Sequence, residues 1–169
     1  MGKVIEFKKF SKNINKANLN KACSDLNMFP DNDSSYIRKE IDISLVEVDH
    51  IINCIYKQLL INEQLITNSE DTGDFDKLLY LKDFNDKLHD VMYFVTNSVY
   101  KNPIIIKVTF LEFKYLVGTL QLEIGLLNDP DENEKSNVSS DYLKVIENLY
   151  NRFYHVYKNW ENEFYSEPT

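Results

Sequence analysis

The side chains best suited to chemistry in this sequence are its three histidines, its two cysteines and the acids beside them. Glu47 and His50 have the Glu-x-x-His spacing that di-iron helical bundles use twice, together with further inward-facing carboxylates. His50 and Cys54, four positions apart, would share one helix face and could form half of a zinc site. No second pair of ligands accompanies either motif. We therefore predict no metal, no cofactor and no catalytic residue, and a protein that is not an enzyme.

The two cysteines, Cys23 and Cys54, belong to no Cys-x-x-Cys pair. The N-terminus lacks the apolar core of a secretory signal, and no run of 18 apolar residues could cross a membrane. Disulfides form mainly in secreted proteins. The sequence therefore predicts two free thiols in a cytoplasmic protein.

An internal repeat organises most of the chain. Residues 41–103 align without a gap on residues 106–168, at a separation of 65 positions, and most apolar positions coincide. Ser44 with Glu47, and Thr109 with Glu112, occupy equivalent positions and have the spacing of a capping box, which starts a helix. The equivalent of His50 is Tyr115, so the second copy has no Glu-x-x-His motif and a symmetric metal centre loses support.

Each copy predicts a pair of helices. Apolar residues recur at helical spacing over 45–65 and 75–100 in the first copy, and over 110–127 and 140–165 in the second. Polar loops are expected at 68–73 and 128–132. The β-branched stretches at 36–43 and 104–108 either pair as a small antiparallel ribbon, stay extended, or belong to the start of the helices. The predicted fold class is mainly all-α: two tandem helical hairpins forming a pseudo-twofold four-helix bundle with an irregular N-terminal arm.

The net charge of −8 is unevenly distributed. Residues 1–27 hold six basic and two acidic side chains, whereas the rest of the chain is acidic. We expect residues 1–35 to form a basic arm and linker, and residues 36–169 to form the bundle. The acidic body should not bind nucleic acid directly. The arm could contact an anion, lie on the acidic bundle of its own chain, or remain solvated.

The last helix carries more aromatic residues than one buried face can hold. Tyrosine and tryptophan combine a large apolar area with a polar tip, which suits them to interfaces. The alternative is a thick core with tyrosine hydroxyls at its edge. We predict a partner-binding surface made of Tyr150, Tyr154, Tyr157, Trp160, Glu161, Glu163 and Tyr165.

These features favour a small acidic module that binds another protein and inhibits or regulates it. The Asn-, Lys- and Ile-rich composition suggests an AT-rich coding sequence of a low-GC bacterium or of its phage or plasmid. Within the class of binding modules we favour an accessory protein of such an element: an anti-defence inhibitor, a DNA mimic, or an antitoxin or immunity protein. The acid excess would suit a basic nucleic-acid-processing partner. Two alternatives are a helical-bundle enzyme, nuclease-like or metal-binding, and a homodimeric assembly protein.

Overall fold

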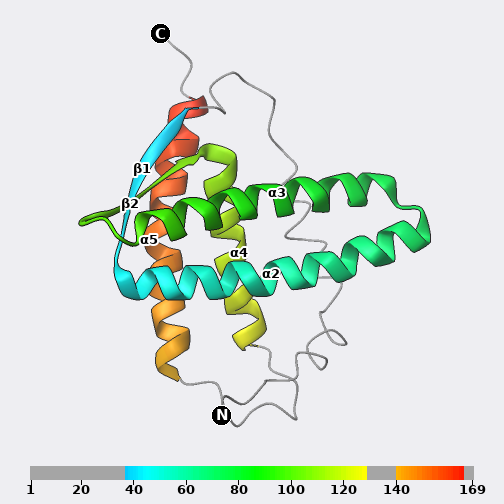
Figure 1. Ribbon diagram of the computed structural model, residues 1–169, viewed down its shortest axis with the longest axis horizontal. Helices are drawn as coiled ribbons and strands as arrows, with labels where there is room; N and C mark the ends of the chain where they lie inside the picture. Colours follow the sequence, from blue (N-terminus) through cyan, green and yellow to red (C-terminus); the bar gives the residue numbers. More distant parts are fainter. Residues whose placement is uncertain (1–36, 129–139, 166–169) are drawn as a thin grey trace.

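The computed structural model describes residues 37–128 and 140–165, which form four helices and one two-stranded ribbon (Figure 1). In chain order, these elements are β1 (Arg38–Ile43), α2 (Leu45–Thr72), α3 (Phe75–Ser98), β2 (Ile104–Thr109), α4 (Phe110–Asn128) and α5 (Ser140–Tyr165). The predicted fold class, two helical hairpins with a small antiparallel ribbon, is confirmed. The predicted N-terminal arm, the polar loop after residue 128 and Cys23 lie outside the described residues.

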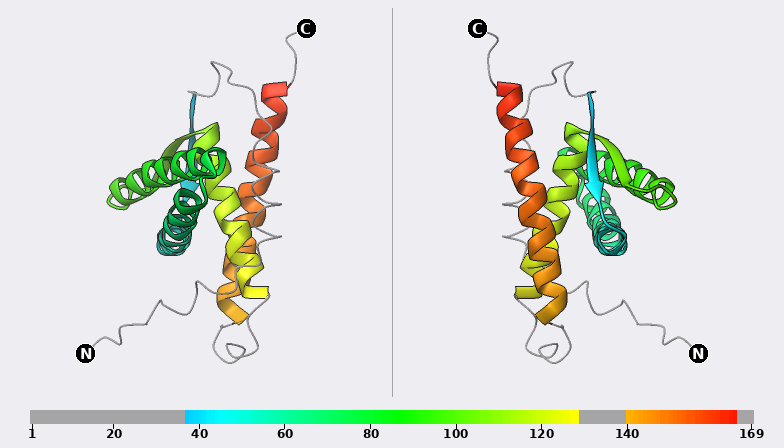
Figure 2. Two further views of the ribbon diagram at one scale, coloured as in Figure 1. Left: turned by 90° about the vertical axis from the view of Figure 1, so that its right-hand side faces the viewer. Right: turned by 90° about the vertical axis from the view of Figure 1, so that its left-hand side faces the viewer.

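The two hairpins form two layers that cross each other. The α2–α3 hairpin runs across the α4–α5 pair in Figure 1, where its turn projects beyond that pair, and Figure 2 shows the hairpin to one side of the pair. Helix α4 occupies the centre, because it packs against α2, α3 and α5. Its residues from Glu112 to Val117 are all buried. A helix covered on one side only would expose some of these six consecutive residues.

Both predicted capping boxes are present. The Glu47 amide donates to Ser44 Oγ at 3.3 Å, and the Ser44 amide donates to the Glu47 carboxylate at 2.7 Å. The corresponding distances at Thr109 and Glu112 are 3.3 and 2.8 Å. Each box supplies acceptors for amide groups that the first turn of a helix leaves without a partner. Each also lies directly after a strand, so the ribbon and both helix starts form one unit.

The register of the ribbon agrees with the internal repeat. Ile41 of β1 lies opposite Ile106 of β2, and these two residues are 65 positions apart. If a twofold axis relates the two strands of an antiparallel ribbon, only the residues next to the axis pair with their own equivalents in the other strand. The pairing therefore places the pseudo-twofold axis of the two copies at Ile41 and Ile106. Both isoleucines are buried, at 5% and 0% exposure, so a slip of one residue would expose them.

A guanidinium group reinforces each capping box, although the two arginines are not equivalent. Arg38 donates twice to the Glu112 carboxylate, at 3.0 and 3.1 Å, and once to the Lys107 carbonyl. Arg152 of α5 donates to the Glu47 carboxylate at 2.7 Å and to the Asp42 carbonyl at 2.8 Å. The acceptors are equivalent in the two copies. The two equivalent junctions between strand and helix are therefore stabilised by arginines from non-equivalent positions in the chain.

The predicted loop at 68–73 is an error. Helix α2 continues to Thr72 and ends at Gly73, whose φ of 71° belongs to the left-handed region that glycine adopts at low cost. Asp74 then starts α3, because its side chain accepts the Lys77 amide at 3.2 Å. The polar run therefore belongs to a projecting helix end.

The two capping glutamates provide a matched test of this corner. The Glu112 side chain is 3% exposed and the Glu47 side chain is 21% exposed. Glu112→Ala should lower the free energy of unfolding by about 3 kcal/mol, because it leaves a buried amide and a guanidinium without their acceptor. Glu47→Ala should cost about 1 kcal/mol. Urea unfolding of both variants measures the difference, and equal losses would contradict the central role of the Arg38–Glu112 pair.

Candidate partner-binding surfaces

The structure corrects part of the predicted aromatic surface on α5. Trp160 is 3% exposed and Tyr157 is 9% exposed, so neither is available to a partner. The Phe110 ring stacks on Tyr157 with centroids 5.4 Å apart and meets Trp160 edge-on at 5.5 Å. Phe113 also contacts Trp160. These two residues belong to the core between α4 and α5, as the alternative interpretation of the stripe required.

The rest of the predicted surface is a narrow stripe. Tyr150 is half-buried and Tyr154 is 40% exposed, and their rings stack 5.5 Å apart. Glu161 accepts hydrogen bonds from Tyr157 and Lys158, and Glu163 pairs with Lys39. The side chain of Tyr165 lies outside the described residues. The two acids therefore already have cationic partners within the chain, although the Glu163 side chain remains 62% exposed.

The structure gathers the predicted chemical residues of α2 around one buried acid. The Glu123 carboxylate of α4 accepts from Lys57 at 2.5 Å and from the Tyr142 hydroxyl at 3.0 Å. Cys54 Sγ lies 3.9 Å from the same hydroxyl, and the half-buried His50 ring lies 5.4 Å from the Tyr142 ring. This polar cluster joins α2, α4 and α5.

The cluster is poorly suited to nucleophilic chemistry. Burial, and then the nearby Glu123, raises the pKa of Cys54 to about 12. Burial, and then the nearby Cys54 and Glu123, raise the pKa of the Tyr142 hydroxyl. Both groups are therefore protonated at neutral pH, whereas a nucleophile needs its ionised form or an adjacent base. Within residues 37–128 and 140–165, no three His, Cys, Asp or Glu side chains are grouped so that they could hold a metal ion.

Large apolar side chains are exposed mainly on the other layer. Six of them define what we call the hairpin face, the solvent side of α2 and α3: Leu45, Val46, Tyr56, Phe75, Leu79 and Tyr93. Each is between 52% and 72% exposed. Leu45 and Tyr56 are 11 residues apart, about three helical turns, and Phe75 and Tyr93 are 18 apart, about five turns. Each pair therefore lies along one side of its helix.

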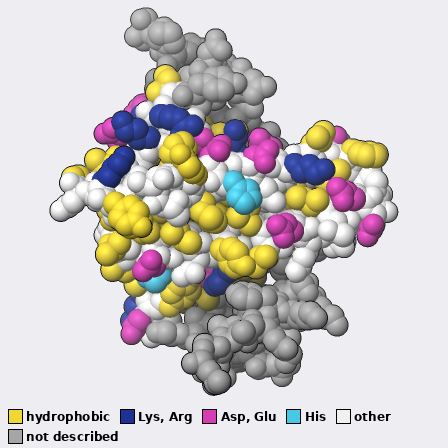
Figure 3. Space-filling model, in the orientation of Figure 1, with side chains coloured by type: hydrophobic (Ala, Val, Ile, Leu, Met, Phe, Trp, Pro, Cys, Tyr) yellow, Lys and Arg dark blue, Asp and Glu magenta, His cyan; other side chains and the backbone are white. Residues whose placement is uncertain are grey.

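Figure 3 shows this side of the molecule. Hydrophobic side chains gather over the part where α2 begins and α3 ends, and again at the hairpin turn, with acidic side chains along the hairpin between them. Exposed large apolar residues at single positions are ordinary, whereas contiguous apolar patches rimmed by polar residues mark interaction sites, and these two groups are the candidates for such a site.

The acid excess of the described residues lies entirely in the same hairpin. Residues 45–98 carry 10 acidic and 4 basic side chains, while the remaining described residues carry 8 of each. Glu70 and Asp71 lie in the last turn of α2, which has no basic residue. A helix C-terminus is negative and favours cations. The N-terminus of α3 lies at the same turn and Lys82 pairs with Glu70 at 3.4 Å, so both offset part of this negative charge beside Phe75 and Leu79.

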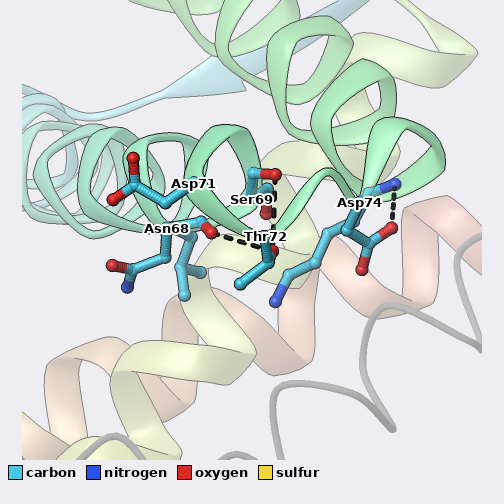
Figure 4. A pocket seen from close by; sticks show the side chains of 7 residues that line it. Asn68, Ser69, Asp71, Thr72 and Asp74 are labelled. Carbon is cyan, nitrogen blue, oxygen red and sulfur yellow. Dashed lines mark hydrogen bonds between the residues drawn. The ribbon is translucent and has the colours of Figure 1, made fainter.

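A recess of about 470 Å³ lies at this turn (Figure 4). Its lining is mostly polar: Leu65, Asn68, Ser69, Asp71, Thr72, Asp74 and Lys77. The Thr72 hydroxyl donates to the Asn68 carbonyl, and Asp74 caps α3. These two contacts stabilise the turn itself, whereas the buried Ser69 Oγ has no hydrogen-bond partner among the described residues.

Comparison of the two copies reveals the hairpin face, and this is the signal that the sequence analysis missed. Tyr56 and Tyr93 correspond to Gln121 and Lys158 in the second copy. Phe75 and Leu79 correspond to Ser140 and Lys144. A residue that the shared packing requires should be apolar in both copies. These four positions are apolar in the first copy alone, so the repeat architecture does not explain them.

The chain matches no protein-family model, no curated protein and no solved structure. In the part of the chain that the structure describes, none of the helices has the length and apolar character needed to cross a membrane.

The core assignment of Trp160 can be tested against Tyr154, its neighbour on α5. Trp160→Ala should lower the free energy of unfolding by about 3 to 5 kcal/mol, because it leaves a cavity beside Phe110 and Phe113. Tyr154→Ala should cost less than about 1 kcal/mol. Urea unfolding followed by circular dichroism gives both values. A small loss in the free energy of unfolding for Trp160→Ala would contradict the assignment of this side chain to the core.

The protonated state of Cys54 can be tested in a Cys23→Ser variant, where Cys54 is the only thiol. Alkylation by iodoacetamide at pH 9 should be at least about tenfold slower in the folded chain than in urea. The folded pKa of about 12 exceeds the ordinary value of 9.0. The stabilising contribution of the thiol is therefore present below pH 9 and is lost as the pH rises toward 12. Equal alkylation rates would show that Cys54 is accessible and ionised.

Proposed function

We propose that this protein is a binding module that inhibits or regulates another protein, and that the hairpin face makes the contact. The observation that carries the proposal is the coincidence of two features on one hairpin. Six large apolar side chains are exposed there, and the whole acid excess of the described residues lies there. Exposed tyrosine and phenylalanine supply the buried anchors of an interface, and the surrounding charges choose the partner and speed its approach.

The complementary partner is a protein with an apolar groove rimmed by lysine or arginine. A nucleic acid fits poorly, because its phosphates would meet 10 acidic side chains with 4 basic ones among them. A basic nucleic-acid-processing protein is the class that fits best. Binding would block its groove, as an anti-defence inhibitor, an antitoxin or an immunity protein does. A pure DNA mimic is less well supported, because Phe75, Leu79 and Tyr93 interrupt the acidic surface.

Self-association through the same face is disfavoured by charge. A twofold dimer brings identical patches together, so each acidic row would face its own copy. Asp49, Asp86 and Asp90 are all exposed on α2 and α3 and would repel their equivalents. A partner of opposite charge avoids this repulsion.

The second copy shows which residues the fold tolerates at positions equivalent to those of the hairpin face, and these residues can be introduced as substitutions. We expect Tyr56→Gln with Tyr93→Lys, which introduces the residues found at 121 and 158, to weaken partner binding at least about tenfold while changing the free energy of unfolding little. The tagged full-length chain would be used to capture partners from cells that express it. Titration of the purified partner then gives the Kd of each variant at low and high salt.

The matched control exchanges residues on the other layer. Tyr150→Asn with Tyr154→His introduces the equivalents found at 85 and 89 and should leave the Kd unchanged. Loss of binding in this control alone would move the interface to α5. Failure of the unmodified chain to capture any partner in a salt-sensitive manner would overturn the proposed function.

A further inference from the structure

The first residue of β1 contacts α3, the second helix of the hairpin. Arg38 lies over the Phe94 ring of α3, with its guanidinium carbon 4.5 Å from the ring centroid. Phe94 follows Tyr93, a member of the hairpin face, although Phe94 itself is only half-exposed. β1 therefore begins close to the end of α3, while Lys39, its second residue, contacts Trp160 and Glu163 of α5.

That leading chain contains a segment of complementary chemistry. Residues 3–12, with the sequence KVIEFKKFSK, hold four lysines and one glutamate, interleaved with Val4, Ile5, Phe7 and Phe10. The hairpin presents the opposite charge and the same apolar character. Basic residues would meet the acidic side chains, while phenylalanine rings would cover exposed ones such as Tyr93 and Leu79.

We propose that residues 3–12 bind the hairpin face of their own chain and so compete with the partner for it. The proposal deepens the proposed function by adding its regulation, and it rests on the hairpin face being a binding surface. A partner must then displace the segment, so the basic segment lowers the apparent affinity and favours partners whose charge exceeds its own.

The length of the chain permits this contact. Residue 12 precedes Arg38 by 26 positions, which can span at most about 85 Å at roughly 3.3 Å per residue. Helix α3 from Phe94 back to Phe75 covers only about 28 Å at 1.5 Å per residue. A tether of this length holds the segment at an effective concentration on the order of a millimolar, so weak contacts are sufficient.

The other layer is a weaker candidate for the same segment. Outside residues 45–98, the described acidic and basic side chains are equal in number. Glu161 and Glu163 of α5 already pair with Lys158 and Lys39. Charge therefore directs the segment to the hairpin.

A spin label on the segment tests the proposal in the full-length chain. Ser11→Cys in a Cys23→Ser background gives one reactive thiol, because Cys54 is buried and its pKa is raised to about 12. With a nitroxide at position 11, the amide signals of residues 79–93 should lose at least about half their intensity at low salt. They should recover at about 0.5 M salt, where exposed charges are screened.

The matched control is the same labelled chain with Lys8→Glu, Lys9→Glu and Lys12→Glu, which should show no broadening on α3. A mixture of isotope-labelled chain without nitroxide and nitroxide-labelled chain without isotope should also show none, because the contact is within one chain. Three results would overturn the proposal: no broadening, broadening confined to α5, or broadening in the mixture. Partner capture does not depend on these signals, so the failure of either proposal is recognised separately.

Discussion

The structure depends on the antiparallel pairing of β1 with β2 and on the helix starts joined to it. Ile41 and Ile106 face each other in the buried centre of the ribbon. Each strand leads within one or two residues into a capping box, and each box accepts an arginine from elsewhere in the chain. Because α2 and α4 start from opposite ends of the same rigid ribbon, their directions are fixed relative to each other. The crossing of the two hairpins follows from this constraint.

The two copies share this frame but fill it differently. The second copy has Phe110 and Phe113 where the first has Leu45 and Val48. Both phenylalanines are buried, Phe110 at 6% and Phe113 at 0% exposure, and they pack on the aromatic rings of α5. Leu45, in contrast, is 60% exposed. The larger apolar residues of α4 therefore pack on both layers, whereas the α2–α3 hairpin packs on one side only, and the other described residues do not cover its opposite side.

Local signals in the sequence were sufficient for most of the fold. Capping boxes, helical periodicity and β-branched lead-ins depend on residues close together in the chain, and the structure confirms them. Two predictions failed because their outcome depends on distant residues. The run from Asn68 to Thr72 is polar because the hairpin end projects into solvent, although it remains helical up to Gly73. Trp160 resembles a surface aromatic until Phe110, 50 positions away, is placed against it.

The same dependence explains why Tyr157 and Trp160, predicted on a surface, belong to the core. Aromatic content alone does not separate core from interface, because α5 uses its rings to pack on α4. The repeat allows equivalent positions of the two copies to be compared, because both copies form the same elements with different residues. Where the second copy has Gln121 and Lys158, the first has Tyr56 and Tyr93, and the helix forms in either case. The fold therefore does not require those tyrosines. Under the proposed function, burial of these exposed rings against a partner, or against a segment of the same chain, would stabilise the contact by removing apolar surface from water.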